Sequence, residues 1–189
     1  MDLSRSSDPE LIERCRADQR AAHASFRALY ERHAPAVLRF LRGLLEEELA
    51  RDALQETFLR VYRQLERFDP GRPFGPWVLG IARHVAQDVQ RRRARRPAGP
   101  LEGEVQDPRA SSPERELERA EERGLLRGCV AALPSTEREV FLLKQVEGLT
   151  YEQVAAAVGC SVRTAKYRMK AALERLEREL RQRGLEESS

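Results

Sequence analysis

The chain has 189 residues, and its 34 basic and 31 acidic side chains leave a formal net charge of only +3. This length suits one large or two small domains. The chain begins with a polar segment and contains no apolar run of the roughly 20 residues that a membrane span needs, which argues against a secretory signal and against direct membrane insertion. We therefore expect a cytoplasmic protein.

The three cysteines, Cys15, Cys129 and Cys160, are scattered and form no CxxC pair. This spacing favours neither a disulfide framework nor a zinc cluster. Isolated cysteines in helical segments are usually small core residues, so a redox role is not indicated. We expect no metal ion or other cofactor.

Helical patterning begins near Asp8, whose carboxylate can cap a helix that carries Pro9 in its first turn. The next apolar residues recur at helical spacing, and Pro35 interrupts them. Because proline fits the first turn of a helix better than its middle, we expect a new helix to begin there. The predicted core residues of this part are Phe26, Leu29, Tyr30, Val37, Leu38, Phe40 and Leu41.

The segment 49–68 has two distinct faces at helical spacing. One is apolar and predicted to be buried, and it consists of Leu54, Phe58, Val61, Tyr62 and Leu65. The other mixes acidic, polar and apolar side chains, and it consists of Asp52, Gln55, Glu56 and Leu59. This mixed face is typical of a docking surface, although an ordinary exposed helix face with one surface leucine has the same pattern.

A dense run of arginines, Arg91, Arg92, Arg93, Arg95 and Arg96, ends the first half of the chain. Such a charge asymmetry suits contact with a polyanion. A solvated helix end, where arginines complement the helix dipole, explains the run equally well.

Helical periodicity stops between residues 96 and 113, a stretch with prolines at positions 97, 100, 108 and 113 and few apolar residues. This composition predicts a flexible tether. No segment has the alternating pattern of a strand, so the fold class is all-α. We expect two helical domains, residues 1–96 and 114–189, joined by a linker at 97–113.

The segment 149–169 has the pattern of a helix-turn-helix. Thr150 and Gln153 can form a capping box, Gly159 can end the first helix, and Ser161 can cap the second. The apolar positions of the second helix are Val162, Ala165, Met169, Ala172, Leu173, Leu176 and Leu180, which leaves Arg163, Lys166, Tyr167 and Lys170 outside. A basic helical hairpin of this kind either reads DNA or forms the solvated face of a bundle.

Two blocks of the sequence resemble bacterial extracytoplasmic-function sigma factors. Region two of that family is similar to ARDALQETFLRVYRQLERFDPGRPFGPWVLGIARHVAQDVQRRR at residues 50–93. Region four is similar to LPSTEREVFLLKQVEGLTYEQVAAAVGCSVRTAKYRMKAALERL at residues 133–176. The two blocks occur in the family's order and at its separation, and together they make the resemblance specific.

The resemblance implies a promoter-specificity subunit rather than an enzyme. Its expected partners are core RNA polymerase, promoter DNA and an anti-sigma factor. On the polymerase, the expected contacts are the clamp coiled coil of the largest subunit and the flap region of the second-largest subunit.

The resemblance also implies a role for particular residues. The docking residues would be Asp52, Gln55, Glu56 and Leu59, against the clamp coiled coil. The minus-ten DNA residues would be Arg83, His84, Gln87, Arg91 and Arg92, in a segment that captures an extruded base. The minus-thirty-five residues would be Arg163, Lys166, Tyr167, Arg168 and Lys170, with Arg138 as a phosphate ligand.

Two residues of the minus-ten segment need separate comment. Trp77 lies four residues before Ile81, with Val85 beyond, so we expect it in the core rather than as a stacking platform for bases. Gly80 lies inside the predicted helix, where it costs about 1 kcal/mol relative to alanine.

Two other functions fit parts of the sequence. A helix-turn-helix regulator could bind DNA without polymerase, but such a protein has no need of the mixed face at Asp52. A nucleic-acid enzyme is poorly supported because His23, His33 and His84 are not paired at metal-ligand spacing and the acidic residues are dispersed.

Overall fold

The computed structural model describes residues 3, 5–17, 19–95 and 124–183. Within these residues every regular element is helical, which confirms the all-α class. The predicted tether at 97–113 lies outside the described residues. None of the described helices is both long enough and apolar enough to cross a membrane.

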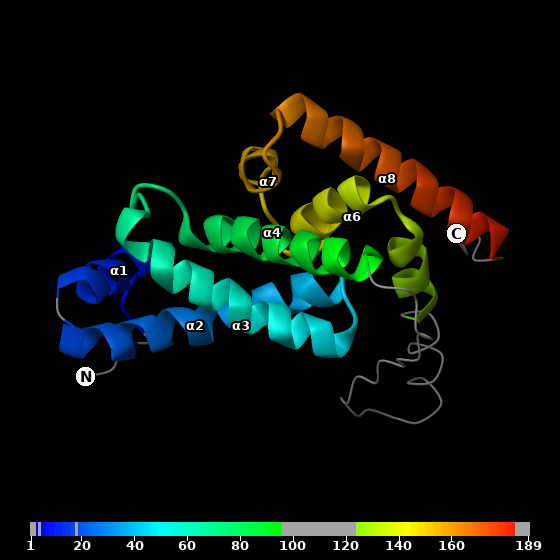
Figure 1. The fold of residues 1–189 in the computed structure, drawn as a ribbon. Helices are drawn as coiled ribbons and strands as arrows, with labels where there is room; N and C mark the ends of the chain where they lie inside the picture. Colours follow the sequence, from blue (N-terminus) through cyan, green and yellow to red (C-terminus); the bar gives the residue numbers. More distant parts are fainter. Residues whose placement is uncertain (1–2, 4, 18, 96–123, 184–189) are drawn as a thin grey trace, which may run out of the picture.

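Four helices and one short turn form the N-terminal part of the molecule (Figure 1). They are α1 (Asp8–Ala17), α2 (Gln19–Arg42), α3 (Glu47–Gln64), the 3₁₀ turn η1 (Leu65–Arg67) and α4 (Phe74–Ala94). Helix α2 packs against α1, α3 and α4, and α3 packs against α4. Fully buried side chains such as Leu29, Phe40, Val61 and Val78 fill the space between them.

Pro35 does not begin a new helix, contrary to the sequence prediction, because α2 runs through it without a break. Proline in a helix interior removes one backbone hydrogen bond and costs about 3 kcal/mol. Burial offsets this cost on both sides of the proline, where Leu29 and Phe40 have no exposed surface. Pro35 itself is exposed.

Helix α1 begins at Asp8 as predicted, but Asp8 is not its cap. Ser7 and Glu10 form the reciprocal pair of hydrogen bonds at this helix start, with Glu10 Oε2 2.8 Å from the Ser7 amide nitrogen. The Asp8 carboxylate instead accepts a hydrogen bond from Arg32 at 2.6 Å and lies 2.9 Å from His33 Nε2. Asp8 therefore ties α1 to α2.

An aromatic cluster fixes the start of α4. Trp77 is half-buried and lies 4.5 Å from the ring of Phe68 and 5.6 Å from that of Phe74, measured between ring centroids. Arg16 of α1 donates to the backbone carbonyls of Leu65 and Phe68, which holds the end of η1 in place. Trp77 thus packs against the core as expected, but it stays half-buried at the edge.

The C-terminal part contains a helical segment at residues 124–132 and four further elements, α6 (Ser135–Phe141), the π-helical turn η2 (Leu142–Val146), α7 (Tyr151–Val158) and α8 (Val162–Gln182). The predicted helix-turn-helix is α7 and α8. Thr150 and Gln153 form the capping box, Gly159 ends α7 with φ of 69°, and Ser161 caps α8 by accepting from the Thr164 amide. These local predictions are confirmed.

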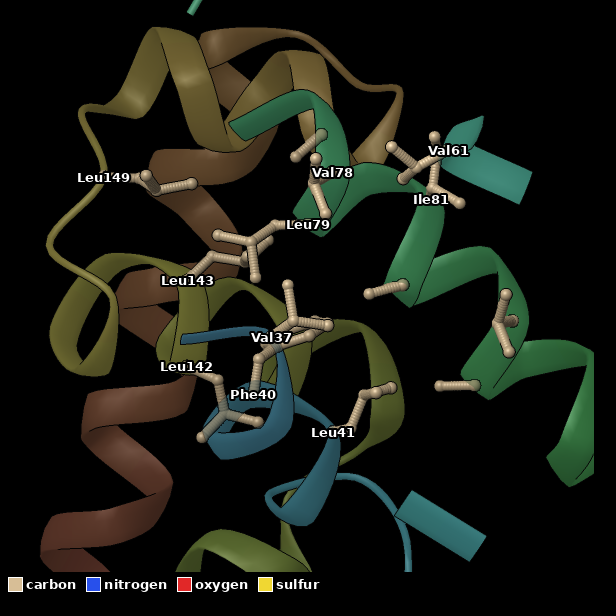
Figure 2. Close-up of a cluster of buried hydrophobic side chains, with 14 of the residues drawn as sticks. Val37, Phe40, Leu41, Val61, Val78, Leu79, Ile81, Leu142, Leu143 and Leu149 are labelled. Atoms are coloured by element: carbon tan, nitrogen blue, oxygen red, sulfur yellow. The ribbon is translucent and has the colours of Figure 1, made fainter. Parts of the chain in front are cut away.

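The two parts share one hydrophobic core (Figure 2). Phe40 and Leu41 of α2, Leu79 of α4, and Leu142 and Leu143 of η2 converge there. Helix α7 also packs along α4. The sequence predicted two domains on a tether, and the structure adds that they pack against each other.

Three residues predicted to be buried are substantially exposed. Tyr62 on α3 is 49% exposed, Leu173 on α8 is 45% exposed, and Tyr30 on α2 is 37% exposed. Each lies at the edge of an apolar face, where helical periodicity does not define how far the neighbouring helix reaches. Tyr62 still packs edge-on against Phe26, at 5.0 Å between ring centroids.

Candidate polymerase and nucleic-acid interfaces

The mixed face on α3 is presented to solvent. Asp52 and Gln55 are exposed, Glu56 is half-buried, and Leu59 is 52% exposed, which is high for a leucine. We call these four residues the α3 stripe. Glu56 also pairs with Arg60 at 2.7 Å. An exposed leucine flanked by acidic and amide groups can contact a partner helix that offers basic side chains around an apolar position.

Tyr62 extends the α3 stripe by one further turn, because it lies three residues beyond Leu59 and both are about half exposed. Sequence reasoning missed this position by assigning Tyr62 to the core. The tyrosine hydroxyl was the one sign in the sequence that this position could be exposed, since tyrosine often buries its apolar ring and keeps its polar tip in water.

The outward side of α8 is a second exposed surface. Arg163 is followed three and four residues later by Lys166 and Tyr167, and these by Lys170, and all four are exposed, Tyr167 at 72%. We call these four residues the α8 face. Opposite them, Ala165, Met169, Ala172 and Leu176 are buried. The helix therefore keeps a basic row in solvent while its apolar side is held by the core.

A cation–π arrangement lies beside the α8 face. The Nζ atoms of Lys144 and Lys166 lie 5.2 Å and 5.6 Å from the centroid of the Tyr151 ring. Lys144 also donates to the carbonyl of Leu149 at 2.9 Å. Lys166 is thereby oriented at the junction of α7 and α8, and its ammonium group remains available to an anion.

Arg138 and Arg168 are less open than the other predicted minus-thirty-five residues. Arg168 is half-buried. The Arg138 guanidinium donates to the carbonyls of Ala131 and Leu133, which end the helical segment at 124–132. Burial lowers the pKa of Arg138 from its usual value, against an opposing effect of Glu139. Arg138 thus caps a helix end, and only part of its surface reaches solvent.

The predicted minus-ten residues of α4 do not share one environment. Arg83 and Gln87 both donate to the carboxylate of Glu139 on α6, at 2.7 Å to Oε2 and 2.8 Å to Oε1. The Arg83 side chain is 12% exposed and that of Glu139 only 2%. The structure therefore places Arg83 and Gln87 in the contact between the two parts of the chain.

His84 lies on a different side of α4 and is exposed. It borders a groove of about 400 Å³ between α4 and α7 whose wall includes Trp77, Gly80 and Ala157. A Cβ atom on Gly80 would lie 3.5 Å from the Cα and carbonyl oxygen of Ala157. Both distances are ordinary van der Waals contacts, so α7 lies against α4 at Gly80 with room for a methyl group.

Arg91 and Arg92 are exposed at the end of α4. Arg91 pairs with Asp88 at 2.7 Å, and Asp88 also pairs with Arg60 of α3 at 3.0 Å. Hydrogen bonds from Arg60 and then Arg91 outweigh burial and lower the pKa of Asp88 from its ordinary value. This end of the helix offers positive charge to a polyanion without any rearrangement of the two parts.

Glu139 was not predicted as a site residue, although the sequence carried a signal. It lies four residues before Leu143 and next to Val140, so it occupies the buried face of α6. A carboxylate at such a position requires a partner. The partners come from α4, more than 50 residues earlier in the chain, and could not be read from the local pattern.

Comparison with protein families gives matches to both parts of the chain. The model described as Sigma-70 region 2 matches residues 29–96, and the model described as Sigma-70, region 4 matches residues 123–176.

Curated relatives match along most of the chain. The RNA polymerase sigma factor CarQ of Myxococcus xanthus is 33% identical over 156 residues, which cover 82% of this chain and 88% of CarQ. The RNA polymerase sigma-H factor of Pseudomonas aeruginosa is 30% identical and covers 94% of this chain and 96% of its own. The ECF RNA polymerase sigma factor SigD of Mycobacterium tuberculosis is 32% identical, with coverages of 82% and 77%.

Solved structures share the fold. CnrH in complex with the cytosolic domain of CnrY superposes with a TM-score of 0.67 and 26% identity, over 92% of this chain and 96% of that one. The sigma factor RpoE in complex with the anti-sigma factor NepR from Bartonella quintana gives a TM-score of 0.69 at 24% identity, over 82% and 96%.

Proposed function

The chain belongs to the extracytoplasmic-function group of the sigma-70 family, and from this premise we propose which of its surfaces carry out each step of initiation. As an alternative sigma factor it directs promoter-specific transcription by core RNA polymerase. Sigma factors are initiation factors rather than enzymes, so the roles proposed below are binding roles.

The α3 stripe is the proposed docking site for the clamp coiled coil of the largest polymerase subunit. The exposure of Leu59 is the observation that carries this assignment, because this apolar side chain lies in solvent one turn beyond Gln55 and Glu56 and is not packed in the core. Its acidic flanks would pair with basic groups, which gives orientation and a fast approach. Tyr62 adds apolar and hydrogen-bonding area at the same edge.

The α8 face is the proposed reader of the minus-thirty-five element. Arg163 lies two residues after the capping Ser161, near the start of the helix, where a side chain reaches base edges in the major groove. Lys166, Lys170 and Arg168 would hold phosphates, and Tyr167 can contact either. For Arg138 we propose a supporting role, since two backbone carbonyls already engage its guanidinium.

The proposed minus-ten surface consists of Arg83, His84, Gln87, Arg91 and Arg92 on α4. Arginine and histidine side chains can stack on extruded bases, and the arginines at the end of the helix can follow the phosphate backbone. His84, Arg91 and Arg92 are exposed, whereas Arg83 and Gln87 become available only when Glu139 releases them.

We also propose that the chain acts in the cytoplasm, contacts the flap region of the second-largest polymerase subunit through its C-terminal part, and is restrained by an anti-sigma factor. The resemblance of the fold to CnrH, which was solved in complex with the cytosolic domain of CnrY, supports a dedicated protein partner. A predicted tether between the two parts would let both contact such a partner.

Run-off transcription tests the docking assignment. Purified core polymerase and a library of genomic promoter fragments would be combined with the wild-type chain, with Asp52→Arg, or with Glu13→Arg. Glu13 is exposed on α1, away from the α3 stripe, so its reversal makes the same charge change elsewhere.

We expect promoter-dependent transcripts from the wild type and from Glu13→Arg, and their loss with Asp52→Arg. Equal transcription by all three proteins would refute the docking assignment. Specific DNA binding by the wild type without any polymerase-dependent transcript would instead indicate a stand-alone helix-turn-helix regulator.

A further inference from the structure

We propose that Glu139 is an internal competitor of promoter DNA for α4. In the closed chain its carboxylate occupies Arg83 and Gln87, and it must leave before a nucleic acid can use them. The inference rests on the proposed minus-ten role of these two residues. It adds that the arrangement in which the two parts of the chain pack against each other, here called the closed state, controls access to them.

The chemistry of the contact supports competition. Arginine binds both carboxylates and phosphates through its N–H donors, and here Arg83 Nε donates to Glu139 while the Arg83 side chain is only 12% exposed. Glu139 uses both oxygens, one on Arg83 and one on Gln87, and its side chain is almost completely buried. DNA and Glu139 therefore cannot bind this pair at the same time.

Other contacts hold the same two parts together. Arg39 of α2 donates to both carboxylate oxygens of Glu147, at 3.0 Å and 2.6 Å, and the Glu147 side chain is 2% exposed. Gly43 lies so close to Leu142 that an added Cβ would meet Leu142 Cδ1 at 2.6 Å. The closed state is thus a packed interface in which the contacts of Glu139 with Arg83 and of Glu147 with Arg39 join the N-terminal helices to the C-terminal part.

The other two surfaces remain available in this closed state. The α3 stripe and the α8 face both point to solvent, so polymerase docking and minus-thirty-five contact need no opening. A buried ion pair also contributes little net stability, because desolvation offsets most of its attraction. We call the contact of Glu139 with Arg83 and Gln87 the latch. Opening also exposes apolar side chains of the core that the two parts share, so it takes place when polymerase holds the two parts on separate surfaces.

The first experiment measures closure directly, by single-molecule energy transfer between dyes placed at Glu13→Cys and Arg178→Cys. The background carries Cys15→Ser, Cys129→Ala and Cys160→Ser, so that only these two positions react. The latch variant is Glu139→Gln, and the control is Glu137→Gln. Glu137 lies on the same helix but pairs with Arg175 of α8, within the C-terminal part.

We expect Glu139→Gln to raise the ratio of open to closed molecules about tenfold or more, because removal of one partner leaves the largely buried Arg83 charge uncompensated in the closed state. Its affinity for a single-stranded oligonucleotide carrying the minus-ten element of a promoter found by run-off transcription should rise by a similar factor while the closed form dominates. Glu137→Gln should change neither quantity. An unchanged distance distribution in Glu139→Gln would overturn the proposal.

The second experiment locks the closed state. Gly80→Cys and Ala157→Cys, in the same cysteine-free background, place two thiols across the α4–α7 contact, where an added Cβ at position 80 lies 3.5 Å from Ala157 Cα. We expect the oxidised protein to lose run-off transcription and to regain it on reduction with dithiothreitol. Full activity of the oxidised protein would overturn the proposal.

These outcomes separate the latch from the function on which it rests. The energy-transfer measurement uses neither DNA nor polymerase, so it reports on Glu139 even if the chain fails to support transcription. If the wild type supports transcription but Glu139→Gln stays closed, the proposed function is retained and the proposed role of Glu139 is rejected.

Discussion

Helices α4 and α8 are each 21 residues long and each carry basic and polar side chains, but the row on α8 is open whereas part of that on α4 is covered. On α8, Arg163 and Tyr167 project into solvent, whereas on α4, Arg83 and Gln87 are held by Glu139. The difference arises from how many neighbours each helix has. A similar pattern of cations can therefore mark either an exposed surface or one that must first be released.

The apolar residues of the two helices explain this contrast. The buried residues of α8 recur at helical spacing and cover one side, as Ala165, Met169 and Leu176 show. In α4 the buried residues include the unbroken run from Val78 to Ala82, which covers several sides of the helix. A helix that is apolar on several sides needs several partners, and α4 packs against α2, α3 and α7, whereas α8 packs against α6 and α7.

The largest effect is expected in the core that covers α4. Leu143→Ala should lower the free energy of unfolding by about 2–5 kcal/mol, because Leu143 is fully buried where the two parts meet. Leu173→Ala, at a largely exposed position of α8, should stay within about 0.5 kcal/mol. Urea denaturation would measure both. Similar losses for the two variants would mean that the shared core does not form in solution.

Binding by the α8 face should be measurable without polymerase. Arg163→Ala should cost about 1–3 kcal/mol on the cognate minus-thirty-five duplex and relax its sequence preference, whereas Lys170→Ala should weaken all duplexes and reduce the salt dependence. Competition binding over a range of salt concentrations would show both effects. A uniform loss for Arg163→Ala across sequences would contradict the assigned division between base and phosphate contacts.

The close approach of α7 to α4 is tested by Gly80→Ala. The new methyl group would meet Ala157 at 3.5 Å, an ordinary van der Waals contact, and alanine is favoured over glycine in a helix by about 1 kcal/mol. We expect a stabilisation of about that size or slightly less in thermal unfolding. A clear destabilisation would show that the two helices lie closer together than the structure places them.

The smallest effect concerns the open end of α4. Hydrogen bonds from Arg60 and Arg91 hold the pKa of Asp88 below its ordinary value, so its contribution to stability is complete above that value and disappears as the pH falls through the lowered one. Asp88→Asn should cost about 0.5 kcal/mol at neutral pH. Unfolding measured across the acidic range should show the difference from wild type vanish, and a constant difference would disprove the ionic origin.

Some local features could be predicted from the sequence and others could not. The capping box at Thr150, the left-handed Gly159 and the cap at Ser161 followed from the sequence, because each depends on residues within three or four positions. The break expected at Pro35 was wrong because burial on both sides keeps α2 continuous. The exposure of Tyr62 was missed because the edge of an apolar face depends on the neighbouring helix.

The sequence by itself determined the all-α class, the helix-turn-helix with its basic outer row, and the mixed stripe on α3, because these are properties of single helices. Only the tertiary structure decided that α7 packs on α4 and that Glu139 binds Arg83 and Gln87. The physical reason is the distance along the chain. No local periodicity records which buried charge will meet which arginine more than 50 residues away.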